Sequence, residues 1–230
     1  MNAEFTYKIP DSILSLHAAP LMCAGASVFE ALHAAGAQKG DRVGIVGLGG
    51  LGHMATLFAT AMGCSVTILS NGEQKLEDAF KLGATQFRDT TKLTTSITRN
   101  LDGELQRHES ASFQINILLI TSNAVPRLLT LLPLLARRAT IVLMTIQQDS
   151  LEVPYLQFVL PGHKLIASTD ARKDHYPKML AFAAEHRIKP WVEEFPMDAE
   201  GVKRAMERLE RNEIRFRGVL VRGDQSQQSV

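Results

Sequence analysis

Cysteine and tryptophan are scarce in this chain of 230 residues, which contains two cysteines and one tryptophan. Cys23 and Cys64 are too few for a disulfide framework, and they exclude a structural zinc site built from four cysteines. Low cysteine usage without a disulfide framework is typical of the reducing cytosol. We therefore expect a cytoplasmic location.

A strong net charge and a long hydrophobic run are also missing. The formal net charge is +1, with 45% hydrophobic and 21% charged residues, as in ordinary globular proteins. This balance gives no electrostatic reason to bind nucleic acid or an anionic membrane. No apolar run is long enough to cross a bilayer, and the N-terminal MNAEFTYKIPDS lacks the pattern of a secretory signal. We expect neither nucleic acid nor membrane as a partner.

Short β-branched or apolar runs alternate with helical patterns through most of the chain. This alternation predicts an α/β fold, a Rossmann-type doubly wound parallel sheet with right-handed crossovers. We also expect Pro20 to interrupt the first helix, Asn123 to cap the fourth, and residues 91–112 to form a loose helix and a loop. The expected strands are 42–47, 65–69, 85–87, 113–120, 139–145, 164–168 and 216–221, and the expected helices are 12–36, 50–62, 73–82, 123–135, 171–185 and 198–211.

The glycine-rich loop after the first expected strand is the sharpest motif. It reads GLGGLG over residues 47–52 and stands between a buried strand and an Ala-rich helix, the context that gives a GxGxxG motif its meaning. Gly47 permits the tight turn, Gly49 lets the backbone approach a pyrophosphate, and Gly52 lets the helix pack closely. The helix start offers free N–H groups to phosphates. We predict a dinucleotide site; the alternative is a glycine-rich turn without a ligand.

The end of the second expected strand indicates which dinucleotide binds. An acidic residue there would accept hydrogen bonds from the ribose hydroxyls of NAD, whereas polar and basic groups suit the 2′-phosphate of NADP. This chain has Ser70 and Asn71 at that place and Lys75 within reach. Glu73 argues mildly for NAD, and Lys75 has the simpler interpretation of a solvated surface charge. We predict NADP(H).

Several motifs occur together in a fixed order: AAPLMCAGASVFEAL, DRVGIVGLGGLGHMA, VTILSNGEQK, KLGATQF, and then EFPMD, AMERL and RFR near the C-terminus. This order resembles the cinnamyl-alcohol-dehydrogenase-like branch of the medium-chain zinc-dependent alcohol dehydrogenase superfamily, over about residues 9–221. The resemblance implies a Rossmann domain, a residual fragment of a GroES-like catalytic domain, and NADP(H)-dependent oxidation or reduction. The implied substrates are small alcohols, aldehydes or ketones, or activated alkenes.

The resemblance also implies roles for single residues. It makes Cys23 a ligand of the catalytic zinc, Ser70 and Lys75 the holders of the 2′-phosphate, and Arg217 a cation near the cofactor phosphates. His53, which follows the glycine loop, is expected to be structural. The full set of expected cofactor contacts is Ser27, Gly47, Gly49, Gly50, Leu51, Gly52, Ser70, Asn71, Lys75, Thr121, Thr145, Ser168 and Arg217.

The expected zinc site departs from the family pattern. The first cysteine ligand, the GHE motif and the four-cysteine loop that the family carries do not occur in this sequence. A tetrahedral catalytic zinc needs three protein ligands, and only Cys23 matches one, so we expect an incomplete zinc site. Without partners, Cys23 is more simply interpreted as a small buried hydrophobic residue.

The expected nicotinamide pocket also departs from the pattern. Residues 144–147 (MTIQ) and 168–171 (STDA) replace glycine-containing turns and would narrow the pocket. Without zinc, a carbonyl substrate needs another electrophile, and Ser27, Thr145 and Tyr155 are the candidates. Catalytic residues are otherwise not assigned.

Three functional hypotheses follow. The first is an NADP(H)-dependent oxidoreductase, the second a non-redox cyclase or isomerase or a non-catalytic remnant that uses the same cleft, and the third an interaction module. We expect a homodimer through the apolar edge strand at 164–168, because an unpaired edge invites aggregation. The expected domain organisation is a catalytic-domain remnant at 1–38, the dinucleotide-binding domain at 39–190, a return segment at 191–222 and a disordered tail at 223–230.

Overall fold

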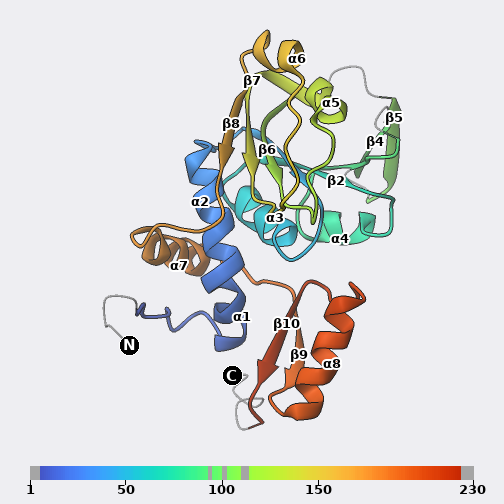
Figure 1. Ribbon diagram of the computed structural model, residues 1–230. Helices are drawn as coiled ribbons and strands as arrows, with labels where there is room; N and C mark the ends of the chain where they lie inside the picture. The colour runs from blue at the N-terminus through green and yellow to red at the C-terminus, as the bar shows by residue number, and fades with distance from the viewer. Residues whose placement is uncertain (1–5, 93–94, 100–102, 110–113, 224–230) are drawn as a thin grey trace.

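The computed structural model describes residues 6–92, 95–99, 103–109 and 114–223. Its centre is an eight-stranded sheet with the order β5-β4-β3-β2-β1-β6-β7-β8 (Figure 1). The six strands from β3 to β8 in that order run parallel. This is the predicted doubly wound Rossmann-type sheet, whose order reverses between β1 and β6. The parallel strands are β1 (Arg42–Val46), β2 (Ser65–Ser70), β3 (Gln86–Asp89), β6 (Ile115–Ile120), β7 (Leu135–Leu143) and β8 (Lys164–Ala167).

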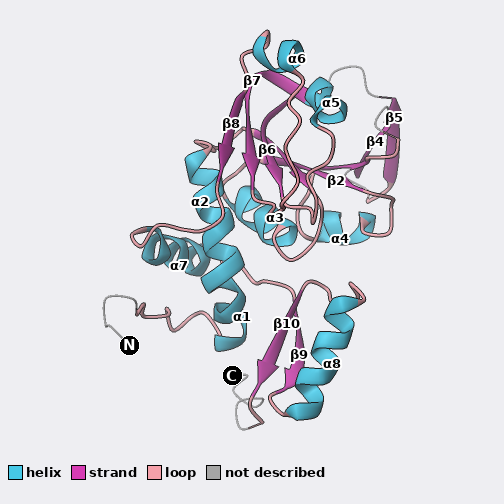
Figure 2. Ribbon diagram, viewed as in Figure 1, coloured by secondary structure: helices cyan, strands magenta, loops and turns pink. Residues whose placement is uncertain are grey.

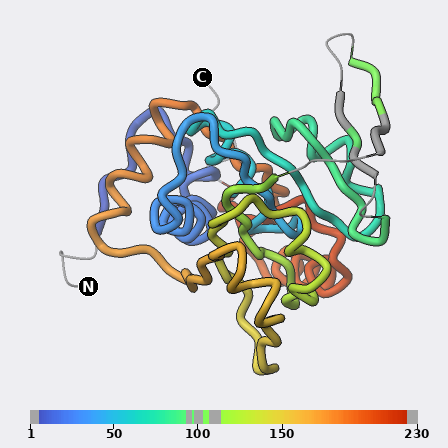
Figure 3. Tube along the Cα trace, turned by 90° about the horizontal axis from the view of Figure 1, so that it is seen from above, coloured from blue at the N-terminus to red at the C-terminus, as the bar shows by residue number. Residues whose placement is uncertain are grey.

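Helices cover the sheet and bring distant segments of the chain together (Figure 2). α3 (Gly52–Ala61) packs on β1 and β2, and α4 (Leu76–Lys81) packs on β3. α2 (Ala26–Ala34) packs against both α3 and α7 (His175–Glu185), so the N-terminal helices lie beside a late segment of the chain (Figure 3). The N-terminal helix α2 thereby contributes to the same hydrophobic core as α3 and α7.

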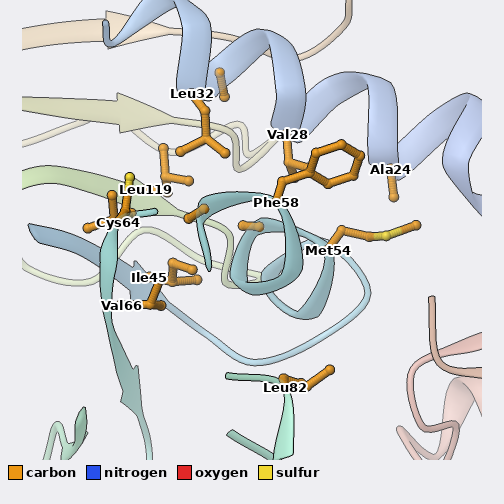
Figure 4. Close-up of a cluster of buried hydrophobic side chains, with 14 of the residues drawn as sticks. Ala24, Val28, Leu32, Ile45, Met54, Phe58, Cys64, Val66, Leu82 and Leu119 are labelled. Carbon is orange, nitrogen blue, oxygen red and sulfur yellow. The ribbon is translucent and has the colours of Figure 1, made fainter. Parts of the chain in front are cut away.

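The larger hydrophobic core lies between α2, α3 and the sheet. Val28 from α2, Phe58 from α3, Ile45 from β1 and Leu119 from β6 are buried there, with Cys64 at the start of β2 (Figure 4). Burying a side chain of this size stabilises a fold by about 1.5–3 kcal/mol. Cys64 is therefore a residue of the hydrophobic core.

The first predicted helix is one continuous helical run with a change of pitch at Pro20. α1 (Ser15–Pro20) passes into a π-helical turn, η2 (Leu21–Gly25), and then into α2. Proline lacks the N–H that an α-helix uses, and a π-turn is one way to accommodate the irregularity. The irregularity expected at Pro20 is present as a change of pitch, and the helical run itself continues without a break.

The prediction of a loose helix at 91–112 was wrong. β4 (Thr95–Arg99) and β5 (Leu105–Glu109) pair antiparallel and extend the sheet beyond β3. Thr95, Ile97 and Thr98 are β-branched, and Ile97 is buried. β3 supplies hydrogen-bond partners for the backbone of β4. The polar local sequence does not indicate this tertiary contact.

The prediction of a helix at 123–135 was also wrong. Only α5 (Leu128–Leu131) is α-helical; a 3-10 turn, η3 (Leu132–Leu134), follows, and β7 already begins at Leu135. Arg127, and not Asn123, occupies the N-cap position. The prolines explain the shortening: Pro126 precedes the helix and Pro133 lies in the 3-10 turn, where it cannot donate a helical hydrogen bond.

A small unit follows the main sheet near the C-terminus. β9 (Val192–Pro196) and β10 (Arg217–Val221) pair in parallel, and α8 (Ala199–Glu210) connects them (Figure 1). Asp198 caps α8 by accepting a hydrogen bond from the backbone N–H of Gly201 at 2.7 Å. β9 was not predicted, and neither was α6 (Tyr155–Val159), which leads into β8.

The predicted domain boundaries after residues 38 and 190 stay predictions. Of the predicted tail at 223–230, only Gly223 lies within the described residues. Among the helices that the structure describes, none is both long and apolar enough to cross a membrane.

Candidate functional site

Two glycines of the 47–52 loop are required by the fold itself. Gly47 has a φ of +89°, and a Cβ there would meet the Cα of Ser122 at 2.9 Å. A Cβ on Gly52 would lie 1.9 Å from the carbonyl oxygen of Gly47, so any side chain would push α3 away from the loop. The turn therefore brings the start of α3 close to the end of β1, as the motif predicts.

Gly49 differs from its neighbours because nothing in the described structure requires a glycine there. A Cβ at this position would meet no atom within 4 Å, and the residue is not among those with positive φ. Glycine at a position that is neither strained nor crowded leaves the backbone open to a close approach from outside the chain. The next position is different, since a Cβ on Gly50 would meet the guanidinium of Arg217 at 2.9 Å.

Threonine hydroxyls fix the loops that surround the glycine turn. The Oγ1 of Thr121, after β6, lies 2.9 Å from the carbonyl oxygens of both Val46 and Gly47. The Oγ1 of Thr145, after β7, donates to the carbonyl of Ser122 at 2.7 Å. Both residues lie at the carboxyl ends of neighbouring strands, where open α/β sheets place their ligands. Their hydroxyls hold backbone groups in place.

The segment after β2 carries the residues expected to select the cofactor. Ser70 ends β2 and is partly exposed, and Asn71 is exposed. Lys75 turns back toward the glycine loop and donates from Nζ to the carbonyl of Leu48 at 2.7 Å. Burial lowers the pKa of Lys75, the nearby Arg215 lowers it further, and Asp78 opposes the shift. Lys75 is thus a half-buried cation at the loop, and the interpretation as a freely solvated surface charge was wrong.

Sequence reasoning missed the residue that shapes this segment. Asp89, at the end of β3, accepts hydrogen bonds from the backbone N–H of Gly72 at 3.1 Å and from the backbone and hydroxyl of Thr91 at 2.9 and 2.7 Å. These donors hold the pKa of the Asp89 carboxyl below its ordinary value. The acidic residue followed by two threonines was the available signal, but its partner at Gly72 is supplied by the pairing of β2 with β3.

Two serines are also among the expected cofactor contacts. Ser27 is buried on α2, and its hydroxyl donates to the carbonyl of Cys23 at 3.0 Å. Ser168, directly after β8, is also buried, and its hydroxyl has no hydrogen-bond partner within the described structure. A buried hydroxyl without a partner is costly, so this group is available to a ligand at the carboxyl end of the sheet.

His53 is part of the support beneath the loop. It is fully buried, its Nδ1 lies 3.2 Å from the carbonyl oxygen of Gly49, and its ring stacks on Phe216 at 5.1 Å. Burial lowers the pKa of His53 to about 4, so the ring is neutral at pH 7. Trp191 stacks with Phe216 as well, at 5.7 Å. The expectation of a structural role for His53 agrees with this packing.

The greater part of the chain matches a known protein family. The zinc-binding dehydrogenase family matches residues 50–185, more than half of the chain. This chain belongs to that family. The resemblance inferred from the sequence motifs is confirmed.

Relatives of this family member are plant alcohol dehydrogenases and reductases. It is 35% identical over 223 residues to a probable mannitol dehydrogenase of Mesembryanthemum crystallinum, covering 96% of this chain and 58% of the relative. It is 33% identical to cinnamyl alcohol dehydrogenase 8 of Arabidopsis thaliana, covering 94% and 57%. The chain therefore spans less than two thirds of the length of these relatives.

Solved structures agree with the fold. A cinnamyl alcohol dehydrogenase from Sorghum bicolor superposes with a TM-score of 0.82 at 30% identity, covering 95% of this chain and 58% of that one. The cinnamyl alcohol dehydrogenase of Helicobacter pylori, solved with NADP(H), has a TM-score of 0.72 at 24% identity, covering 89% and 54%. The second likeness is one of fold.

The described residues of this family member do not fit a catalytic zinc. Cys23 is exposed, which corrects its interpretation as a buried hydrophobic residue; it lies in the π-helical turn, whose buried residues are Leu21, Ala24 and Gly25. Within the part of the chain that the structure describes, no three His, Cys, Asp or Glu side chains come together as metal ligands. One thiolate does not make a tetrahedral site.

The candidate electrophiles do not meet at one place. Tyr155 is strongly exposed on α6, which precedes β8 and so lies at the amino end of that strand, away from the glycine loop. Ser27 and Thr145 already donate their hydroxyl protons to the backbone carbonyls of Cys23 and Ser122. The prediction of Tyr155 as an electrophile at this site was wrong, and neither serine nor threonine hydroxyl is free.

Proposed function

We propose that this chain binds NADP(H) across the glycine loop and acts as an oxidoreductase on a small alcohol, aldehyde or ketone. The observation that carries the proposal is Gly49. It is the one position of the GxGxxG motif whose missing side chain serves no contact among the described residues, whereas Gly47 and Gly52 are needed by the fold. An open backbone beside a helix start is where a pyrophosphate approaches.

The preference for NADP(H) over NAD(H) rests on the segment after β2. Ser70 and Asn71 provide donors where an acidic residue would favour NAD, and Lys75 adds a positive charge next to the loop. Charge-assisted hydrogen bonds to a phosphate are about twice as strong as neutral ones. Lys75 at present donates to a neutral carbonyl, so it loses little by turning to a phosphate.

The reaction would use the carboxyl end of the sheet to orient the nicotinamide. When bound, NADP(H) supplies or accepts a hydride at a carbonyl or alcohol carbon. Thr121 and Thr145 fix the loops after β6 and β7, and the unpartnered hydroxyl of Ser168 is available to the carboxamide group. No step is assigned to a metal ion. The two plant relatives, named as a probable mannitol dehydrogenase and a cinnamyl alcohol dehydrogenase, support this reaction class.

A homodimer and a cytoplasmic location complete the proposal. β8 is one of the two outer strands of the main sheet. The segment that precedes β8 in the chain carries four exposed apolar side chains, Tyr155, Leu156, Val159 and Leu160. An apolar surface next to an open strand edge is covered by a second copy in many proteins.

The test is a titration of the purified chain with NADPH and, in parallel, with NADH, followed by nicotinamide fluorescence. We expect NADPH to bind with micromolar affinity, about 8 kcal/mol, and NADH at least tenfold more weakly. Consumption of NADPH is then followed with a panel of aldehydes and ketones. Binding of neither nucleotide would overturn the proposal. Binding without consumption by any carbonyl would favour the non-redox use of the same cleft.

A further inference from the structure

Arg215 brings a second cation to the segment that follows β2. Its Nε forms an ion pair with the Oδ2 of Asp78 at 3.2 Å, and Asp78 lies in the first turn of α4. Lys75 directly precedes that helix. Although Arg215 belongs to the C-terminal unit, the ion pair fixes it beside the residues that are expected to select the cofactor.

The two cations share one aromatic support. The Nζ of Lys75 lies 5.9 Å from the centre of the Phe216 ring, and the guanidinium carbon of Arg215 lies 5.8 Å from it. The ring stabilises each cation, but the two positive charges also repel each other. Burial is the main cause of the lowered pKa of Lys75, and repulsion from Arg215 lowers it further. Lys75 and Arg215 therefore place two cations at the start of α4, and Asp78 pairs with the guanidinium of Arg215.

The backbone of Arg215 is held in place from the other side. Its N–H donates to the Oε1 of Glu193 on β9 at 2.6 Å. The other oxygen of Glu193 pairs with Arg208 of α8. The backbone of Arg215 is therefore held to β9, and its guanidinium is held to α4. Only the guanidinium needs to move to reach a ligand. A preorganised cation of this kind loses less conformational entropy on binding.

We propose that Arg215 is a specificity-determining residue that contacts the 2′-phosphate of NADP(H) together with Lys75. Asp78 holds the guanidinium when no phosphate is present. The inference rests on the proposed function and deepens it, because it assigns the discrimination between NADP(H) and NAD(H) partly to the C-terminal unit. The planar guanidinium matches a phosphate bidentately, which the ammonium group of Lys75 cannot do.

The test compares two fragments that differ only in the phosphate in question, 2′,5′-ADP and 5′-ADP, by calorimetric titration. We expect Arg215→Gln to weaken 2′,5′-ADP about tenfold and 5′-ADP less than twofold, the loss of one charge-assisted contact. Arg215→Lys should restore part of the affinity. Arg211→Gln removes the same charge from an exposed position after α8 and should leave both fragments unaffected.

A second variant separates phosphate binding from a structural role. Asp78→Asn breaks the ion pair but keeps the cation, so we expect 2′,5′-ADP binding to be retained or tightened. If the ion pair only ties the C-terminal unit to α4, both variants will lower the melting temperature and weaken the two fragments equally, which would overturn the inference.

The failure of the proposed function has a different signature. If the unaltered chain binds neither fragment, the proposed function falls and the inference falls with it. If the unaltered chain prefers 2′,5′-ADP and Lys75→Gln removes that preference while Arg215→Gln does not, only the inference is overturned.

Discussion

The guanidinium of Arg217 fills the space beside Gly50 that a side chain would otherwise occupy. Its Nε donates to the carbonyl of Gly50 at 3.2 Å, and a Cβ on Gly50 would lie 2.9 Å from its Cζ. The two residues are separated by 167 positions in the chain. The C-terminal unit thus brings a cation to the loop that is expected to hold a pyrophosphate.

Replacement of Arg217 should affect the two nicotinamide cofactors alike. The pyrophosphate is common to NADPH and NADH, so we expect Arg217→Gln to weaken both by a similar factor, about tenfold. Fluorescence titration of each nucleotide measures the two factors, with Arg211→Gln as the charge-matched control. Selective loss of NADPH would place Arg217 at the 2′-phosphate instead.

Alanine substitutions at Gly49 and Gly52 should have opposite consequences. Gly49→Ala adds a methyl group to open space, so the melting temperature should change little while nucleotide binding is lost. Gly52→Ala forces the methyl against the carbonyl of Gly47 and should destabilise the fold by about 3–5 kcal/mol. Thermal unfolding and NADPH titration of both variants give the result. Unchanged NADPH affinity in Gly49→Ala would contradict the proposed approach of the pyrophosphate.

The buried His53 should make the fold sensitive to acid. Its pKa in the folded chain is about 4, below the ordinary value of 6.5, so the unfolded chain takes up the proton first as pH falls. This contribution is fully present above pH 6.5 and is lost progressively down to about pH 4, up to about 3 kcal/mol.

Urea unfolding at several pH values measures this dependence. His53→Gln keeps a side-chain N–H near the carbonyl of Gly49 but cannot titrate, so its stability should fall less steeply between pH 6.5 and 4. His17 and His163 also have pKa values lowered by burial and remain in both proteins, which makes the difference between them specific for His53. Equal slopes would show that His53 does not carry the effect.

The edge of the main sheet gives a prediction about assembly. Leu160 precedes β8 and is 71% exposed, so a glutamate there should disrupt a dimer formed across this edge. Light scattering after size-exclusion chromatography is expected to show a dimer for the unaltered chain and a monomer for Leu160→Glu. Leu209→Glu, at a similarly exposed leucine on α8, is the matched control and should stay dimeric. A monomeric unaltered chain would contradict the proposal.

The parallel strands and the glycine turn could be predicted from local patterns in the sequence. Continuous apolar runs indicated β1, β2 and β6, and the spacing of Gly47 and Gly52 follows from a steric requirement inside the loop. The proline signals at 126 and 133 were also present in the sequence, although the longer helical pattern around them outweighed them in the prediction.

Tertiary structure alone decided the features that depend on distant partners. The hairpin β4–β5 exists because β3 offers an edge to pair with, and the turn after β2 depends on the carboxylate of Asp89. Arg215 and Arg217 reach α4 and the glycine loop only because β10 pairs with β9. The secondary-structure propensity of a segment depends on neighbouring residues and not on a partner more than 100 residues away. The periodicity of the sequence therefore could not predict that these two arginines contact α4 and the glycine loop.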